Sequence, residues 1–280
     1  MFGSSCPSSA LQAGRVRGLR TVAGLVFAAA GLLLASAAPA TAATGISHPD
    51  ADHAGSGLAG TGSATVIQPL AASVKGMDVA SYEGNVNWAT AWKNGAKFAY
   101  AKATESTTYT NPYFAQQYNG SFTVGMIRGA YHFALPNKSG GAAQADYFVA
   151  HGGGWSKDGK TLPGAVDMEW NPYSGGDCYG LSTASMVSWI KAFSNEYHAK
   201  TTRYPVIYTA TAWWSECTAN KGNFSATNPL WLANYNGSPG TMPYHWGTYT
   251  IWQSADHGTF PGDQDVFNGA YDRLQALANG

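Results

Sequence analysis

The stretch LPGAVDMEWNP, residues 162–172, ends an apolar run with two acids, Asp167 and Glu169. Side chains alternate between the two faces of a strand, so these two residues are expected on the same face. Two carboxylates on one buried face repel each other and lose hydration, which is costly unless partners neutralise them or the pair performs chemistry. The stretch therefore predicts a buried strand that ends in a partnered or a catalytic pair.

Strand and helix patterns alternate on both sides of this stretch. Asn111 and Ser182 stand where helix caps are expected, and each precedes a pattern with the helical period. The expected helices span 87–95, 113–122, 140–154, 183–200 and 211–219. The expected strands span 75–80, 96–103, 126–134, 164–170, 204–210, 229–235 and 248–255.

This alternation indicates a parallel sheet, and seven or eight strands in one domain favour a closed barrel over an open sheet. The last third of the barrel is poor in helices, since none is expected between residues 235 and 248. A doubly wound open sheet is the alternative, but no Gly-x-Gly-x-x-Gly or Walker sequence follows any strand. The expected fold class is therefore α/β with a TIM-like barrel, whose functional residues gather at the carboxyl ends of the strands.

Residues 1–42 have the pattern of a secretory signal peptide. Arg15, Arg17 and Arg20 precede a long apolar run that ends at Ala40-Thr41-Ala42, an Ala-x-Ala cleavage signal. A retained membrane anchor is the alternative, because the run approaches the roughly 20 residues that a membrane span needs. We favour cleavage, because little after the run resembles a stop-transfer flank, and we expect a secreted, extracellular protein with no membrane association.

The remaining chain is predicted to contain a leader and one domain. Residues 43–73 are rich in Gly, Ala, Ser and Thr without periodicity, as in a flexible leader or propeptide, and residues 74–280 form the barrel. Loss of residues 1–42 leaves 13 basic and 16 acidic residues, a net charge of −3. Nucleic acid is therefore not an expected partner, because it is bound by clustered Lys and Arg.

Aromatic residues make up 13% of the chain and charged residues only 11%. Carbohydrate suits such a surface, since rings stack on sugars, although most of these rings are expected to fill the core. Cys178 and Cys217 are the two cysteines outside the signal peptide, and in a secreted protein an even number predicts a disulfide. No cofactor or metal is expected, because zinc-binding spacings are missing from the sequence.

Further acids fall near the ends of the other expected strands. Asp78 lies within or at the end of the first strand, Glu105 just after the second, and Asp263 and Asp265 after the last. For each acid alone, a solvated loop position or a helix cap is the alternative. Because the chain has only 16 acids, their joint position indicates a functional rim.

Several motifs, in their order along the chain, resemble the family 25 glycoside hydrolases, the CH-type lysozymes. The resemblance extends from about residue 74 to the end and rests on GMDVASYEGNVNW, FAYAKATESTTYTNPYF, MIRGAYHFALP, LPGAVDMEWNP, DCYGLS, VIYTATAWW and DQDVFNG. It implies a barrel of eight strands with about five helices. It also implies hydrolysis of the β-1,4 bond between N-acetylmuramic acid and N-acetylglucosamine in peptidoglycan, by a protein we expect to be a monomer.

The resemblance also implies roles for the acids. Glu169 matches the proton donor, Asp167 the carboxylate beside it, Asp78 the acid of the first strand and Glu105 the acid of the Lys-Ala-Thr-Glu motif. Either Asp263 or Asp265 matches the late acid. The sequence departs from the family in two places, because Glu83 stands where Gln is usual and Ser106 where Gly is usual. Glu83 adds a charge that is expected to raise a neighbouring pKa or alter a sugar contact.

Glycoside cleavage needs an acid for the leaving oxygen and a group that stabilises charge at the anomeric carbon. Glu169 is the expected acid, since Asp167 and burial should raise its pKa. Asp167 would orient the acetamido group of the sugar, which attacks the anomeric carbon. Two alternatives remain: Asp167 as a direct nucleophile, or a water activated by Asp78 or the late Asp. Chitinase-like barrels carry a longer acidic pattern, which Leu162 and Ala165 interrupt.

A secreted protein that binds cell-wall glycan without cleaving it is the alternative function. In that case the acids would only accept hydrogen bonds from sugar hydroxyls. The aromatic side chains and the histidine expected to contact sugar serve either function, although each is also a common core residue. They are Tyr131, His132, Trp170, Tyr208, Trp231, Tyr235 and Trp252.

Overall fold

The computed structural model describes residues 53–58 and 73–280. The predicted signal peptide lies outside these residues, and so does most of the predicted leader. The described part of the leader ends in a short 3-10 turn, η1 (Ser56–Leu58). Within the described ranges, no helix is both long and apolar enough to cross a membrane.

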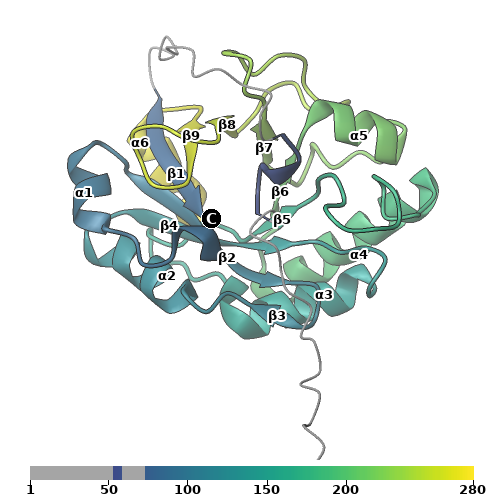
Figure 1. The fold of residues 1–280 in the computed structure, drawn as a ribbon, viewed down its shortest axis with the longest axis horizontal. Helices are drawn as coiled ribbons and strands as arrows, with labels where there is room; N and C mark the ends of the chain where they lie inside the picture. Colours follow the sequence, from purple (N-terminus) through teal and green to yellow (C-terminus); the bar gives the residue numbers. More distant parts are fainter. Residues whose placement is uncertain (1–52, 59–72) are drawn as a thin grey trace, which may run out of the picture. The chain divides into compact units, whose positions relative to one another are not determined.

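The strands form one sheet that closes on itself. Its order is β1-β9-β8-β7-β6-β5-β4-β2-β3, and β1 also pairs with β2, so every strand except β3 belongs to a closed barrel (Figure 1). The predicted eight-stranded α/β barrel is thus confirmed. The strands are β1 (Val74–Val79), β2 (Phe98–Glu105), β3 (Tyr109–Thr110), β4 (Ile127–Phe133), β5 (Ala165–Asp167), β6 (Val206–Thr209), β7 (Leu230–Ala233), β8 (Ile251–Ala255) and β9 (Asp263–Phe267).

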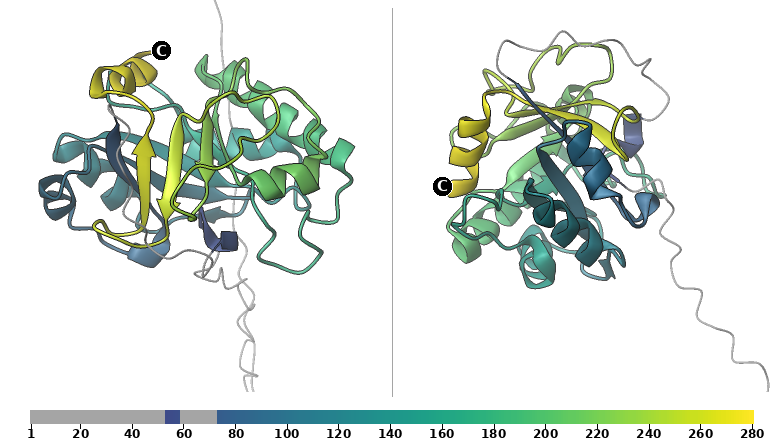
Figure 2. Two further views of the ribbon diagram at one scale, coloured as in Figure 1. Left: turned by 90° about the horizontal axis from the view of Figure 1, so that it is seen from above. Right: turned by 90° about the vertical axis from the view of Figure 1, so that its left-hand side faces the viewer.

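The last strand departs from the expected parallel pattern. β9 runs antiparallel to both β8 and β1, and Figure 2 shows β8 and β9 side by side. Asp263 and Asp265 were expected to follow the last strand, but they lie inside β9. Because β9 runs in the opposite direction, its first residue lies at the rim where its neighbours end.

The helices lie outside the barrel, and the last third of the chain has few of them. Ser182 caps α4 as predicted, since its hydroxyl accepts from the Ser185 amide. Asn111 instead accepts from the Tyr113 amide, and α2 begins only after that turn, at Phe114. Helix α6 was not predicted. The helices are α1 (Trp88–Lys93), α2 (Phe114–Thr123), α3 (Gly141–Phe148), α4 (Thr183–Thr201), α5 (Thr211–Thr218) and α6 (Tyr271–Asn279).

Large aromatic side chains fill the barrel interior. Trp231 on β7 stacks on Tyr100 with ring centroids 4.8 Å apart and meets the edge of Tyr208 at 5.0 Å. All three are almost fully buried. Burial of rings of this size supplies much of the hydrophobic stabilisation of a domain. The interior is therefore a packed core, and a substrate can reach only its rim.

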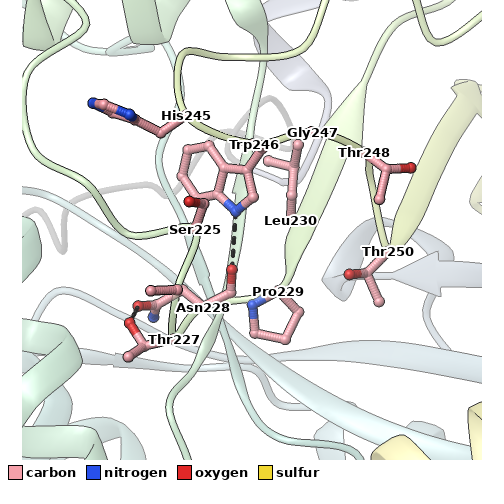
Figure 3. Close-up of a pocket in the computed structure, with 11 residues that line it drawn as sticks. Ser225, Thr227, Asn228, Pro229, Leu230, His245, Trp246, Gly247, Thr248 and Thr250 are labelled. Carbon is pink, nitrogen blue, oxygen red and sulfur yellow. Dashed lines mark hydrogen bonds between the residues drawn. The ribbon is translucent and has the colours of Figure 1, made fainter.

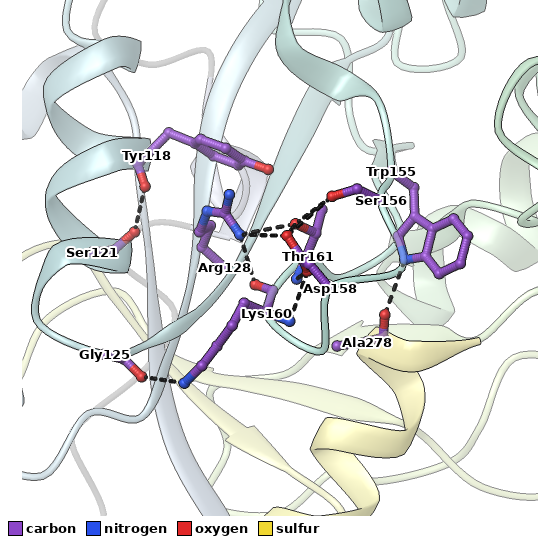
Figure 4. Close-up of polar contacts among 10 residues, drawn as sticks. All are labelled: Tyr118, Ser121, Gly125, Arg128, Trp155, Ser156, Asp158, Lys160, Thr161 and Ala278. Carbon is purple, nitrogen blue, oxygen red and sulfur yellow. Dashed lines mark hydrogen bonds and ion pairs between the residues drawn. The ribbon is translucent and has the colours of Figure 1, made fainter.

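A polar cluster lies around the start of β4, at the end of the barrel away from the acids (Figure 4). The Arg128 guanidinium donates to the Lys160 carbonyl at 3.0 Å and to the Thr161 hydroxyl at 2.8 Å. The Trp155 indole binds the Ala278 carbonyl of α6 at 3.1 Å. These contacts tie the loop before β5 to α6, at the end of β4 away from the acids.

Candidate active site

The predicted acids lie at one rim of the barrel, where the parallel strands end. Asp78 is the penultimate residue of β1, Glu105 ends β2 and Asp167 ends β5. Asp263 begins the antiparallel β9 and lies directly opposite Asp78. All four side chains are buried. The carboxyl ends of the strands therefore gather the acids as the barrel fold requires.

Asp167 and Glu169 are both buried, with 1% and 2% of their surface exposed. Burial, and then the charge of Glu169, raise the pKa of Asp167 well above its ordinary range. Burial also raises the pKa of Glu169 to about 7. The Lys102 ammonium opposes both shifts, because it favours the ionised carboxylates. Such a pair retains a proton at mildly acidic pH, which general acid catalysis requires.

Gln253 on β8 connects the two sides of the rim, and the sequence did not reveal it. Its Nε2 donates to Asp78 Oδ2 at 2.8 Å and to Asp263 Oδ2 at 2.9 Å. Its Oε1 accepts from the hydroxyls of Tyr208 and Tyr235, each at 2.7 Å. The only signal in the sequence was an amide within a strand that is otherwise buried and apolar.

Asp265 lies deeper in the barrel than Asp263. The Trp231 indole donates to its Oδ1 at 2.9 Å. Burial, followed by the Asp78 charge, raises the pKa of Asp265. Burial raises the pKa of Asp78 as well, and Glu83 contributes to that shift, the direction expected for this departure from the family.

Glu105 belongs to a second polar group at the same rim. Its Oε2 accepts from Lys102 Nζ at 2.8 Å, and its Oε1 accepts from the Tyr173 hydroxyl at 2.7 Å. Lys102 and Tyr173 were not predicted site residues. Ser106, the other departure from the family, has φ +48°, a left-handed conformation that glycine adopts with less strain. This explains why glycine suits that position.

The predicted aromatic residues divide into three sets. Tyr131, Tyr208 and Trp231 line the barrel interior, and Tyr235 and Trp170 lie beside the acids at the rim. Trp252 precedes Gln253 in β8, so it faces outward, where its indole binds the Asn234 carbonyl at 2.8 Å.

His132 also points away from the acids. It lies between β4 and the helices, packed against Phe148 and Phe193. Its Nδ1 pairs with the Thr104 hydroxyl at 2.8 Å and its Nε2 with Gln144 Oε1 at 2.9 Å. Burial lowers its pKa to about 3, so it is neutral at physiological pH. The structure therefore gives His132 the surroundings of a core residue.

The described part of the leader lies against the acids. Glu169 Oε1 accepts from the Gly55 amide at 3.0 Å and Oε2 from the Gly57 amide at 2.7 Å. Ala54 is fully buried, with its amide 3.3 Å from the Tyr131 hydroxyl and its carbonyl 3.0 Å from Gln253 Nε2. This contact was not predicted, because the leader has no periodic apolar pattern.

The predicted Cys178–Cys217 disulfide is present and joins the loop after β5 to α5. Within residues 53–58 and 73–280, no group of three His, Cys, Asp or Glu side chains could hold a metal ion. A hollow of about 390 Å³ lies between the loops 225–230 and 245–250, and Figure 3 shows Trp246 and His245 beside it. Its lining contains none of the acids.

Comparisons with known proteins agree with this geometry. The family model described as "Glycosyl hydrolases family 25" matches residues 77–263. A Chalaropsis N,O-diacetylmuramidase is 54% identical over 74% of this chain and all of its own. Lysozyme M1 of Streptomyces globisporus is 43% identical over 97% of this chain and 98% of its own, so that match includes most of the leader. The solved structure of a muramidase from Trichobolus zukalii has a TM-score of 0.72 and is 52% identical over 74% of this chain and 99% of its own.

Proposed function

Because the chain belongs to family 25 of the glycosyl hydrolases, we propose that it is a secreted lysozyme that cleaves the bond between N-acetylmuramic acid and N-acetylglucosamine in bacterial peptidoglycan. The names of the relatives, a muramidase and a lysozyme, support this substrate. The observation that carries the proposal is the buried pair of Asp167 and Glu169 at the rim. The name N,O-diacetylmuramidase is a reason to include O-acetylated walls among the substrates tested.

In the proposed mechanism Glu169 protonates the glycosidic oxygen as its bond to the anomeric carbon breaks. The sugar that contains this anomeric carbon also carries an acetamido group, whose carbonyl oxygen attacks the carbon, while ionised Asp167 accepts a hydrogen bond from the acetamido N–H. The attack closes a ring between the acetamido group and the anomeric carbon. Water then opens this ring at the anomeric carbon and gives its proton to Glu169, which restores the acid. Burial supports the first step, because it raises the pKa of Glu169 to about 7.

Asp78 and Asp263 are proposed to bind sugar hydroxyls, held in place by Gln253. Glu105 is proposed as a positioning residue, because it holds the buried Lys102 ammonium, whose charge acts on both members of the pair.

The test is digestion of purified peptidoglycan by a chain that begins at Ser73, with mass spectrometry of the fragments. A muramidase leaves reducing-end muramic acid. Glu169→Gln should lower the rate by about two orders of magnitude or more, because general acid catalysis contributes that much. Glu216→Gln, at an exposed position on α5, is the matched control and should keep full activity.

The same variant separates the enzyme from a protein that only binds glycan. If Glu169→Gln and the unchanged chain release no fragments and bind peptidoglycan equally well, the binding function holds instead. Reducing-end glucosamine or free peptides would refute the muramidase proposal.

A further inference from the structure

The leader residues His53–Leu58 occupy the place that substrate needs. Three of them, Ala54, Gly55 and Gly57, contact the rim through backbone atoms. Together they bind both oxygens of Glu169, the Tyr131 hydroxyl and the Gln253 amide. We infer that His53–Leu58 is an intramolecular inhibitor, which keeps the hydrolase inactive while it is docked on the acids of the rim.

The contact excludes substrate because it uses the proton donor itself. With amides at 3.0 Å and 2.7 Å, both oxygens of Glu169 have a donor facing them. A glycosidic oxygen must come within hydrogen-bond reach of the same carboxyl to receive its proton. The Gly55 and Gly57 amides occupy that position, so leader and substrate cannot bind together.

The leader also disturbs the division of protons within the pair. The hydrogen bonds that the Gly55 and Gly57 amides donate favour the ionised form of Glu169. In contrast, neither oxygen of Asp167 has a hydrogen-bond partner in the described structure. Catalysis needs the reverse arrangement, with Glu169 protonated and Asp167 ionised. The leader therefore opposes the active form of the pair in addition to blocking access.

The shape of the segment fits this role. The Ser56 amide donates to the His53 carbonyl and the Leu58 amide to the Gly55 carbonyl, each at 2.9 Å, which forms a tight turn. Gly55 has φ +97°, and a side chain there would overlap the Tyr235 hydroxyl. A Cβ on Gly57 would lie 2.5 Å from Trp170 Cδ1 and 2.9 Å from Glu169 Oε2. Only glycine allows the backbone to approach the acids so closely at these positions.

The experiment compares four chains on peptidoglycan: residues 43–280, the same chain with Gly57→Val, the same chain with Gly247→Val, and residues 73–280. The last contains every strand of the barrel, from β1 to β9. Gly57→Val prevents docking without touching the barrel fold. Gly247→Val is the matched control, since a Cβ there meets nothing within 4 Å.

We expect the 43–280 chain and its Gly247→Val variant to be at least about tenfold slower than the other two, because a tethered segment acts at millimolar effective concentration. Hydrogen exchange of the Gly55 amide should be slow in 43–280 and fast in the Gly57→Val variant. Equal activity of 43–280 and 73–280 would overturn the inference, and so would unprotected exchange at Gly55.

The inference rests on the proposed function only for its activity readout. If 73–280 releases no fragments, the proposed function fails. The exchange measurement then still decides whether His53–Leu58 is docked on Glu169, since it needs no substrate.

Discussion

Among single residues, Gln253 matters more for the geometry of the acidic rim than any of the predicted aromatic residues. Its one amide group satisfies two tyrosine hydroxyls and two carboxyls, all of them buried. Replacing a side chain that serves several buried polar groups leaves each of them without a partner, at a cost of about 1–3 kcal/mol per group. The geometry of the rim therefore depends on a residue that takes no direct part in the chemistry.

Gln253→Leu should lower the unfolding free energy of residues 73–280 by about 4 kcal/mol or more, because leucine keeps the volume but binds none of the four groups. Urea unfolding at neutral pH measures this. Gln275→Leu, at an exposed position on α6, should change stability by less than about 0.5 kcal/mol. Equal effects of the two variants would show that the Gln253 contacts contribute nothing.

Glu169 sets a second expectation at this scale. A general acid must be protonated, and burial raises the pKa of Glu169 to about 7. The kcat/KM of the 73–280 chain should therefore fall as pH rises above the pKa of Glu169 in that chain, by about tenfold per pH unit beyond it. A rate that stays constant from pH 6 to pH 9 would contradict the role of Glu169 as the acid.

At the scale of the element, the disulfide fixes the loop that follows Glu169. Cys178 and Cys217 are 39 residues apart, and their bond ties this loop to α5. The loop also carries Tyr173, which binds Glu105 across the rim. The bond therefore stabilises the fold and holds one wall of the site.

The Cys178→Ala/Cys217→Ala double variant should lose about 2–4 kcal/mol of unfolding free energy, because opening a loop of this length restores entropy to the unfolded chain. Urea unfolding of the 73–280 chain checks the value. The unchanged protein in reducing agent should show a similar loss, and a stable reduced protein would contradict the prediction.

Part of the fold and of the candidate site could be predicted from the sequence. The alternation of strands and helices predicted the barrel, and the spacing of Asp167 and Glu169 predicted a buried pair, because both depend on local periodicity. The direction of β9 could not be predicted, since three of the five residues of DQDVF are polar and its pairing with β1 joins distant parts of the chain. The leader contact was missed for a related reason, because it is made by backbone amides and not by a side-chain pattern.

At the scale of the whole molecule, the buried titratable groups make stability depend on pH. Burial raises the pKa values of four aspartates and of Glu169, so the native chain binds more protons than the unfolded one in neutral solution. His132 acts in the opposite direction, because its pKa is lowered to about 3. Its contribution is fully present above the unfolded pKa of about 6.5 and is lost as pH falls towards 3. The aspartates are Asp78, Asp167, Asp263 and Asp265.

Between pH 6.5 and 8 the unfolded His132 loses the rest of its charge, which raises stability, while native Glu169 loses its proton through its pKa of about 7. Across this range Glu169 holds the larger fraction of a proton, so the unfolding free energy should fall from pH 6.5 to 8, by less than about 1.4 kcal/mol per pH unit. Urea unfolding across this range tests the slope. Glu169→Gln, which has no such proton to lose, should abolish the fall, and a rise of stability towards pH 8 in the unchanged chain would contradict the account.

The pairing of β1 with β9 means that the barrel can close only after nearly all of the chain has been synthesised. It joins the first strand of the barrel to the last, and Asp78 meets Asp263 across it. Until β9 has been made, β1 and β8 each present an open edge of the kind that recruits other chains. A chain that stalls before Asp263 therefore lacks both the closed sheet and part of the acidic rim. Such a product would be removed by chaperones and proteases, and it could not act on a cell wall as a partial enzyme.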